Sequence, residues 1–227
     1  MQSSAQSFWA GVRAELPLLI GVFPFGMIYG ALALSAGLPP AAAQFMSSIV
    51  FAGSSQFAAA QLVQDAAPPL VIVATIAAVN LRHMLYSASL APYIKHLSIR
   101  WKALLAYLLT DEAYAVTIVH YQEQGITASG HWFYLGAGLA LWTTWQTSSA
   151  VGIFLGAALP ASWPLDFALP LTFIALVVPA LKDRPAAGAA LSAGVASLFA
   201  YALPFKLGFL VAGLIGILVG LYLEGRR

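Results

Sequence analysis

The chain has 227 residues and is poor in charge, since it carries 10 basic and 8 acidic side chains while 61% of its residues are hydrophobic. A soluble domain of this length carries about 57 charged residues, and the mean hydropathy of +0.85 leaves too little polar surface for water. These values exclude an ordinary soluble domain, and the net charge of +2 without a basic cluster excludes a nucleic-acid partner.

Apolar runs separated by short polar or proline-rich breaks divide the chain into segments. Their bounds are 16–36, 41–63, 69–93, 103–121, 132–159, 165–181, 186–203 and 207–223. Because a helix needs about 20 apolar residues to cross a bilayer, we expect an all-α, polytopic integral membrane protein with about seven to eight hydrophobic segments. Residues 1–227 are expected to form a single membrane domain, with a short N-terminal tail at 1–15 and a basic C-terminal tail at 224–227.

The first segment, 16–36, resembles a signal peptide only superficially. Pro24 and Gly26 interrupt its apolar core, Glu15 lies in its flank, and no convincing small-residue cleavage site follows. We therefore expect the segment to be retained, with structural breaks at Pro24 and Gly26.

The second segment, 41–63, contains Phe-Ala-Gly-Ser-Ser-Gln-Phe at residues 51–57. In water this would be a turn, but its aliphatic flanks place it at membrane depth, where unwound backbone is tolerated only beside protein or a cavity. Unwound backbone binds amino and carboxylate groups in transporters, so candidate substrate-binding residues are Gly53, Ser54, Ser55 and Gln56. Close helix packing through these small residues is the equally weighted alternative.

The basic residues in the loops indicate which loops lie on the same side of the membrane. Eight plain crossings leave five of them on one side and four on the other, which is no bias. If segments 41–63 and 165–181 are re-entrant or broken, the N-terminus, the 95–102 loop, the 182–184 loop and the C-terminus share one face. That face collects eight of the ten basic residues. Pro170 and Pro179 supply structural breaks for the second of these segments.

The third segment, 69–93, carries charge where hydrocarbon disfavours it. At 100° per residue, its polar side chains form two faces, one with Arg82, Tyr86, Ser89 and Tyr93 and the other with Asn80, His83 and Ser87. Arg82 and Tyr86 are candidate substrate-binding residues, since an arginine binds a carboxylate bidentately. The alternatives for Arg82 are a snorkelling anchor and a structural ion pair with Asp111 or Glu112.

The fourth segment, 103–121, places five hydroxyl side chains within one helical arc, with Asp111 at its edge. Such a stripe beside a carboxylate is typical of a wet pathway or a polar helix interface. We therefore predict that Asp111, then Glu112, with His83 and Tyr114, form a proton pathway for coupling. For His83, a structural role bonded to a neighbouring helix is the more frequent alternative.

The sequence gives little indication of a metal site or of enzyme activity. There is no cysteine, and the four histidines at 83, 96, 120 and 131 lack ligand spacing, so no metal site and no cofactor are expected. A membrane enzyme would need a nucleophile beside a base, and no such arrangement is recognisable, so no catalytic residue is assigned. In the fifth segment, polar side chains at 142–149 point in nearly every direction, which predicts a helix surrounded by protein.

Several blocks resemble the AzlC family, the large subunit of branched-chain amino acid exporters. They are Pro24-Phe25-Gly26, residues 51–57, Asn80-Leu81-Arg82-His83 with 85–90, Thr110-Asp111-Glu112, and residues 169–179. The blocks follow the order of that family and cover roughly residues 12–220.

The resemblance implies proton-driven secondary export of valine, leucine and isoleucine, and of methionine or analogues, across the cell inner membrane. It also implies a partner, a small hydrophobic membrane subunit of the AzlD type. A passive amino-acid channel and a scaffold for a smaller transport subunit are the alternatives. The expected partners are thus the substrate, the small subunit and the lipid bilayer.

Overall fold

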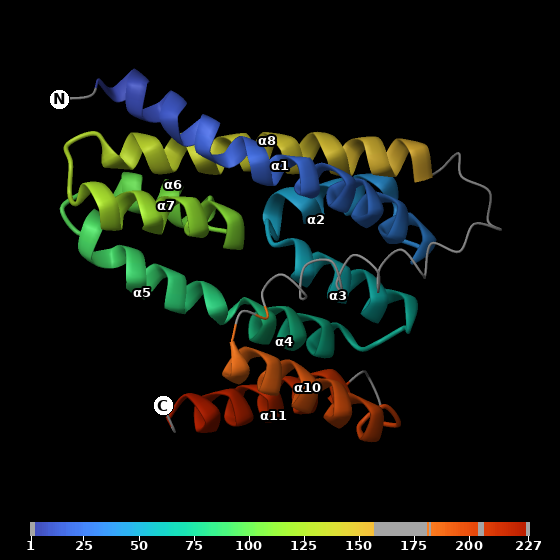
Figure 1. Cartoon of the computed structure of the whole chain (residues 1–227). Coiled ribbons are helices and arrows are strands. Elements are labelled where there is room, and N and C mark those ends of the chain that lie inside the picture. Colours follow the sequence, from blue (N-terminus) through green and yellow to red (C-terminus); the bar gives the residue numbers. More distant parts are fainter. Residues whose placement is uncertain (1–2, 157–180, 182, 204–206, 226–227) are drawn as a thin grey trace.

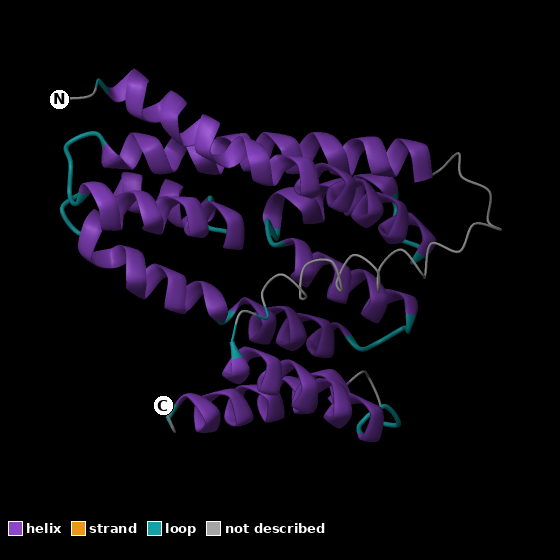
Figure 2. Ribbon diagram, in the orientation of Figure 1, coloured by secondary structure: helices purple, strands orange, loops and turns teal. Residues whose placement is uncertain are grey.

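The structure is a computed structural model, and it describes residues 3–156, 181, 183–203 and 207–225. Within these ranges helices are joined by short connections and no strand occurs, as Figure 2 shows. The all-α class expected from the sequence is therefore confirmed. The helices are α1 (Ser4–Ser35), α2 (Pro40–Ile49), α3 (Gly53–Gln64), α4 (Pro69–Asn80), α5 (Arg82–Ile94), α6 (Ile99–Tyr107), α7 (Asp111–Gln124), α8 (Gly130–Gly156), α10 (Arg184–Phe199) and α11 (Leu207–Glu224).

The two longest described helices, α1 and α8, pack along each other and run in the same direction (Figure 1). Gly11 meets the main chain of Phe133, and Gly26 meets Ser148, so the contacts advance in step along both helices. At 1.5 Å per residue, α1 is about 48 Å long and α8 about 40 Å, enough to cross a hydrocarbon core of about 30 Å. Among the described helices, this pair shares the most extensive contact.

The break predicted at Pro24 and Gly26 is wrong, because α1 continues from Ser4 through both residues to Ser35. Proline removes one main-chain hydrogen bond, but the helix is held against α8 on both sides of this point. Gly26 is buried, and its missing side chain lets Ser148 approach. The residue therefore serves helix packing in this structure.

Two helical hairpins enter the bundle from opposite ends and turn inside it (Figure 1). Helices α2 and α3 are about 15 and 18 Å long, and α6 and α7 about 14 and 21 Å, so none of them spans the bilayer alone. The two turns meet, because the Tyr107 hydroxyl at the end of α6 donates to Ser48 O near the end of α2 at 2.7 Å. Segment 41–63 is thus broken into two short helices that reverse inside the bundle, in agreement with the re-entrant or broken segment that the distribution of basic residues suggested.

Segment 103–121 is a second re-entrant hairpin, and here the prediction of one continuous helix is wrong. Residues 108–110 separate α6 from α7, so Tyr107 and Tyr114 belong to different helices and the predicted hydroxyl stripe is divided. Helices α4 and α5 instead make one crossing from Pro69 to Ile94, with a turn at Leu81 near its middle. That turn lies at the level where both hairpins reverse (Figure 1).

Helices α10 and α11 form an antiparallel hairpin. Gly188 packs against Leu223, and Gly216 packs against Ala189 and Ala193. Segment 165–181, with the breaks predicted at Pro170 and Pro179, lies outside the described residues except for Leu181. Among the described residues, two helical stretches meet a length and hydropathy criterion for membrane spans, Ser4–Ser35 and Pro69–Ile94.

The connection between α5 and α6 lies at the same end of the molecule as the N-terminal end of α1 (Figure 1). This end carries Arg13, Lys95, Arg100 and Lys102, so part of the predicted basic face is present. Of the remaining members, Arg184 begins α10, and Lys182 and the two C-terminal arginines lie outside the described residues.

Candidate functional site

A small pocket lies where the three interrupted helical segments meet. Its lining includes Phe51, Ala52 and Gly53 from the α2–α3 turn, Arg82 and His83 from the start of α5, and Thr110, Asp111 and Glu112 from the α6–α7 turn. Helices α1 and α8 close the remaining sides with Val22, Phe25, Leu141 and Trp145. Residues far apart in the sequence are therefore gathered at mid-depth of the bundle.

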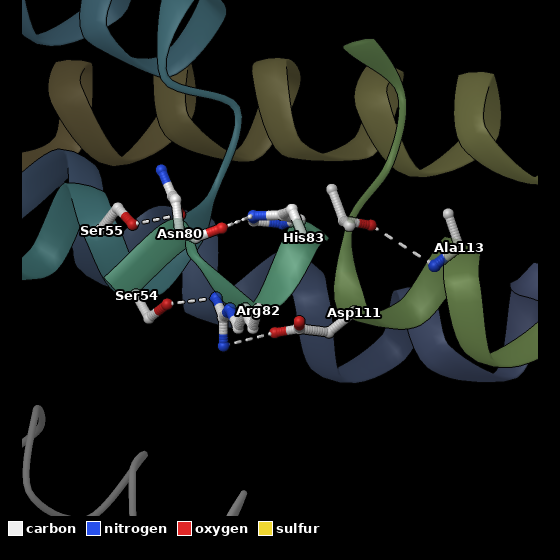
Figure 3. A network of polar contacts seen from close by, with 8 residues as sticks. Ser54, Ser55, Asn80, Arg82, His83, Asp111 and Ala113 are labelled. Carbon is white, nitrogen blue, oxygen red and sulfur yellow. Dashed lines mark hydrogen bonds and ion pairs between the residues drawn. The ribbon is translucent and has the colours of Figure 1, made fainter. Parts of the chain in front are cut away.

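The polar centre of the pocket is an ion pair between two half-buried side chains. Arg82 Nη1 lies 2.9 Å from Asp111 Oδ2, with 32% and 40% of the two side chains exposed. The other terminal nitrogen, Nη2, donates to the Ser54 hydroxyl, so the guanidinium links α5 to both hairpins (Figure 3). Of the alternatives for Arg82, the ion pair with Asp111 is the one the structure shows.

A second set of contacts fixes the main chain around the α4–α5 turn. The Ser55 hydroxyl donates to Asn80 Oδ1 at 2.6 Å, and His83 Nδ1 lies 3.2 Å from Asn80 O (Figure 3). These contacts tie the first turn of α3 to the turn in the crossing helix. Ser55 is thereby occupied in holding the site, while Gly53 and Ser54 face the pocket and the guanidinium.

Helix ends give the pocket a local electrostatic pattern. Helices α3, α5 and α7 all begin at the pocket, and the start of a helix carries partial positive charge and free N–H groups. In the first turn of α7, Asp111 and Glu112 compensate this partial positive charge. The Thr110 hydroxyl accepts a hydrogen bond from Ala113 N at 3.4 Å. The first turn of α3 has no side-chain cap, so its N–H groups remain available to an anion.

The apolar wall of the pocket consists largely of residues that the sequence did not single out. Gly53 allows this wall to approach the α3 turn, because a Cβ there would lie 2.9 Å from the Trp145 ring and 3.1 Å from the Phe25 ring. Trp145 Nε1 donates to Gln56 Oε1 at 2.9 Å. Gln56 is fully buried behind the wall, where it supports Trp145 rather than lining the pocket.

Tyr86 and Tyr114 stand beside the pocket and stack on each other. Their ring centroids are 4.4 Å apart, and the Tyr114 hydroxyl donates to Ser89 Oγ at 3.1 Å. His83 meets the edge of Tyr86, with 5.8 Å between ring centroids. The stack joins α5 to α7 one turn away from the ion pair and so stiffens the arginine–aspartate contact.

The structure thus brings together most of the residues predicted for the site. Gly53, Arg82, His83, Asp111 and Glu112 line the pocket, and Ser54 contacts Arg82. The remaining candidates, Ser55, Gln56, Tyr86 and Tyr114, support these residues from behind. Of the residues that the sequence offers for the substrate's aliphatic side chain, Phe51 lines the pocket, Phe57 is buried outside it, and Leu85 is 72% exposed and lies away from it.

Two polar atoms of the Arg82–Asp111 ion pair could each make a further hydrogen bond. Arg82 Nε and Asp111 Oδ1 are buried and have no hydrogen-bond partner within the described part of the chain. The pocket has a volume of about 40 Å³, enough for a few waters but too small for a leucine side chain. Among the residues that the structure describes, no group of three or more acidic or histidine side chains could hold a metal ion.

Comparison with known proteins gives a consistent picture. The family model for AzlC protein matches residues 17–159, more than half of the chain. The chain is 27% identical to the inner membrane protein YgaZ of Escherichia coli over 228 residues, covering 96% of this chain and 93% of that protein. It is 28% identical to an uncharacterized membrane protein of Archaeoglobus fulgidus over 221 residues, covering 96% and 95%.

The branched-chain amino acid transport protein AzlC of Bacillus subtilis is 25% identical over 175 residues, covering 75% of this chain and 68% of that protein. No solved structure matches the chain significantly. The matched residues include the three helix turns and the pocket between them.

Proposed function

The chain belongs to the AzlC family, and on this premise we propose that it exports branched-chain amino acids across the inner membrane as the large subunit of a two-component, proton-coupled transporter. The family is linked to transport of branched-chain amino acids rather than to catalysis. The observation that carries the proposal is the Arg82–Asp111 ion pair at the meeting point of three interrupted helices. Transporters place substrate sites at such interruptions.

The pocket has complementary groups for each part of a branched-chain amino acid. Arg82 and the uncapped first turn of α3 suit the carboxylate, while Asp111 suits the ammonium group. The aliphatic side chain finds its counterpart in Phe25, Phe51 and Trp145. A zwitterion can therefore enter between Arg82 and Asp111 and replace each partner of the ion pair with one of its own charges.

With a volume of about 40 Å³ the pocket has no room for substrate, so in this proposal the described conformation is a closed one. Entry requires the walls to separate. Two of the walls belong to hairpins that end inside the bundle, and neither hairpin has to move across the whole bilayer. Separation of one hairpin at a time would expose the pocket to one side at a time.

The small subunit belongs to the proposal as well. Helices α4 and α5 expose large apolar side chains, among them Leu70, Val73 and Met84. Such a surface suits either lipid or a small hydrophobic membrane protein. We expect efflux of labelled valine from vesicles to require a small hydrophobic protein encoded beside this chain.

The same vesicles test the site. Arg82→Ala should abolish valine efflux because the substrate carboxylate and Asp111 both lose their cationic partner, whereas Arg13→Ala changes an exposed arginine on α1 and should retain it. Wild-type efflux by the Arg82→Ala variant would contradict the proposed site. A valine gradient that wild-type protein dissipates but never builds under an imposed pH difference would indicate a passive channel.

A further inference from the structure

Glu15 is a buried acidic residue outside the pocket described above. Its side chain is fully buried on α1, and neither carboxylate oxygen has a hydrogen-bond partner in the described part of the chain. Asp111, in contrast, has Arg82 as its cationic partner. An ionised carboxylate buried without a partner is strongly disfavoured, so this closed conformation favours the neutral acid, which holds a proton.

The position of Glu15 connects it with the pocket. It lies on the face of α1 that packs on α8, two helical turns before the pocket residue Val22, which is about 10 Å along the axis. The charged group that acts on it is Glu112, which lines the pocket on α7. Two acids that repel each other cannot easily be ionised together, so the charge of Glu112 and the proton on Glu15 depend on each other.

Further buried polar groups lie on α7 between the pocket and the end of the molecule that carries the N-terminal end of α1. The hydroxyls of Thr117 and Tyr121 are buried and have no hydrogen-bond partner within the described residues. They follow Asp111 by about 9 and 15 Å along the helix. On α8, residues 135–141, which lie level with Glu15, contain no ionisable side chain, and the nearby Tyr134 hydroxyl already donates to Leu105 O.

From this arrangement we propose that Glu15 is the proton-binding site that couples substrate movement in the pocket to the proton gradient. The proposal rests on the proposed transport function. A hydronium ion that arrives along Thr117 and Tyr121 gives its proton to the carboxylate, so one of its O–H bonds breaks as the O–H bond of the neutral acid forms. That bond breaks when the proton leaves to water on the pocket side, beside Glu112. The net step is movement of one proton between the N-terminal end of the bundle and the pocket.

The test separates coupling from transport itself. Full-length protein, with its small partner where efflux requires it, is placed in liposomes and assayed for valine–valine exchange without a pH gradient and for valine accumulation driven by one. Glu15→Gln keeps the shape of the side chain but holds no exchangeable proton. We expect it to retain exchange and to lose accumulation, and the valine-dependent proton flux seen with a pH dye, by about tenfold or more.

Matched variants make the result decisive. Glu123→Gln removes an exposed acid from α7 and should behave as wild type, and Glu15→Asp should restore part of the accumulation. Wild-type accumulation by Glu15→Gln would overturn the proposal. So would loss of exchange in both Glu15 variants, which would indicate a structural role, or dependence of accumulation on Na⁺ rather than on pH. Absence of exchange in wild-type protein would instead refute the proposed transport function.

Discussion

Arg82 shows how one residue can satisfy the bilayer and still serve a substrate. An arginine at mid-depth costs at least about 2.5 kcal/mol unless its charge is matched by protein. Asp111 and Ser54 supply that match in the closed conformation. Because Arg82 and its two partners come from three separate segments, breaking these contacts also loosens the packing between both hairpins and the crossing helix. Substrate that replaces the pair can therefore change the packing of the bundle.

The division of roles between the two charges predicts a change of ligand preference in Asp111→Asn. The variant keeps Arg82 for the substrate carboxylate but lacks the carboxylate that faces the ammonium group. Valine affinity should fall by about 10- to 100-fold, as expected for loss of a charge-assisted hydrogen bond. Affinity for the keto acid of valine, which has no ammonium group, should change little or rise. Calorimetric titration of the purified protein measures both values.

The control for that experiment is Asp65→Asn, which changes an exposed acid at the end of α3. It should bind both ligands as wild type does. A parallel loss of affinity for valine and for the keto acid in Asp111→Asn would contradict the assigned roles. That result would mean that Asp111 acts only by holding Arg82 in place.

At the scale of helices, sequence patterns located some interruptions and missed others. Gly53 and its serine neighbours mark the α2–α3 turn, since glycine and serine disfavour a continuous helix at membrane depth. The α6–α7 turn at Leu108, Leu109 and Thr110 has no such signal, because it contains neither glycine nor proline. Its position depends on contacts with distant segments, such as the bond from Tyr107 to Ser48.

The opposite error occurred at Pro24, where a strong local signal does not interrupt α1. Contact with α8 before and after this residue compensates for the hydrogen bond that proline removes. Apart from Phe51, the aromatic wall of the pocket escaped prediction for a related reason. Phe25 and Trp145 are aromatic residues in apolar segments, and only the packing of α1 with α8 brings them to the same pocket. Polar residues stand out in an apolar segment of the sequence, whereas aromatic residues there do not.

The close packing of α1 and α8 gives a prediction about stability. A Cβ at Gly152 would lie 2.1 Å from Met27 O, so Gly152→Ala must push the two helices apart. We expect a loss of about 1–3 kcal/mol in the free energy of unfolding, typical of an overpacked contact. Gly21→Ala on α1 meets nothing within 4 Å and should be neutral or slightly stabilising. Unfolding of both variants in detergent, followed by circular dichroism, measures the difference. Equal stability of the two would show that α1 and α8 do not approach this closely.

At the scale of the whole molecule, two hairpins enter from opposite ends and reverse at one pocket. Each hairpin covers the pocket on its own side, while α1, α8 and the α4–α5 crossing form a continuous frame between the two ends (Figure 1). A hydrocarbon core tolerates the unwound turns because protein surrounds them. Within the described part of the chain, Arg82, Asp111 and Glu112 are gathered where three helical segments are interrupted, so the surrounding helix surfaces can stay apolar.

The arrangement predicts which connections share a side of the membrane. The chain has no cysteine, so single substitutions can be labelled without background. Leu38→Cys and Ala66→Cys flank the α2–α3 hairpin and should react with an impermeant reagent from the same side. His96→Cys and Gln124→Cys flank the α6–α7 hairpin and should both react from the other side. The basic end with Lys95, Arg100 and Lys102 should face the cytoplasm. Labelling of Leu38→Cys and Ala66→Cys from opposite sides would mean that α2 and α3 cross the membrane, and the same result for His96→Cys and Gln124→Cys would refute the second hairpin.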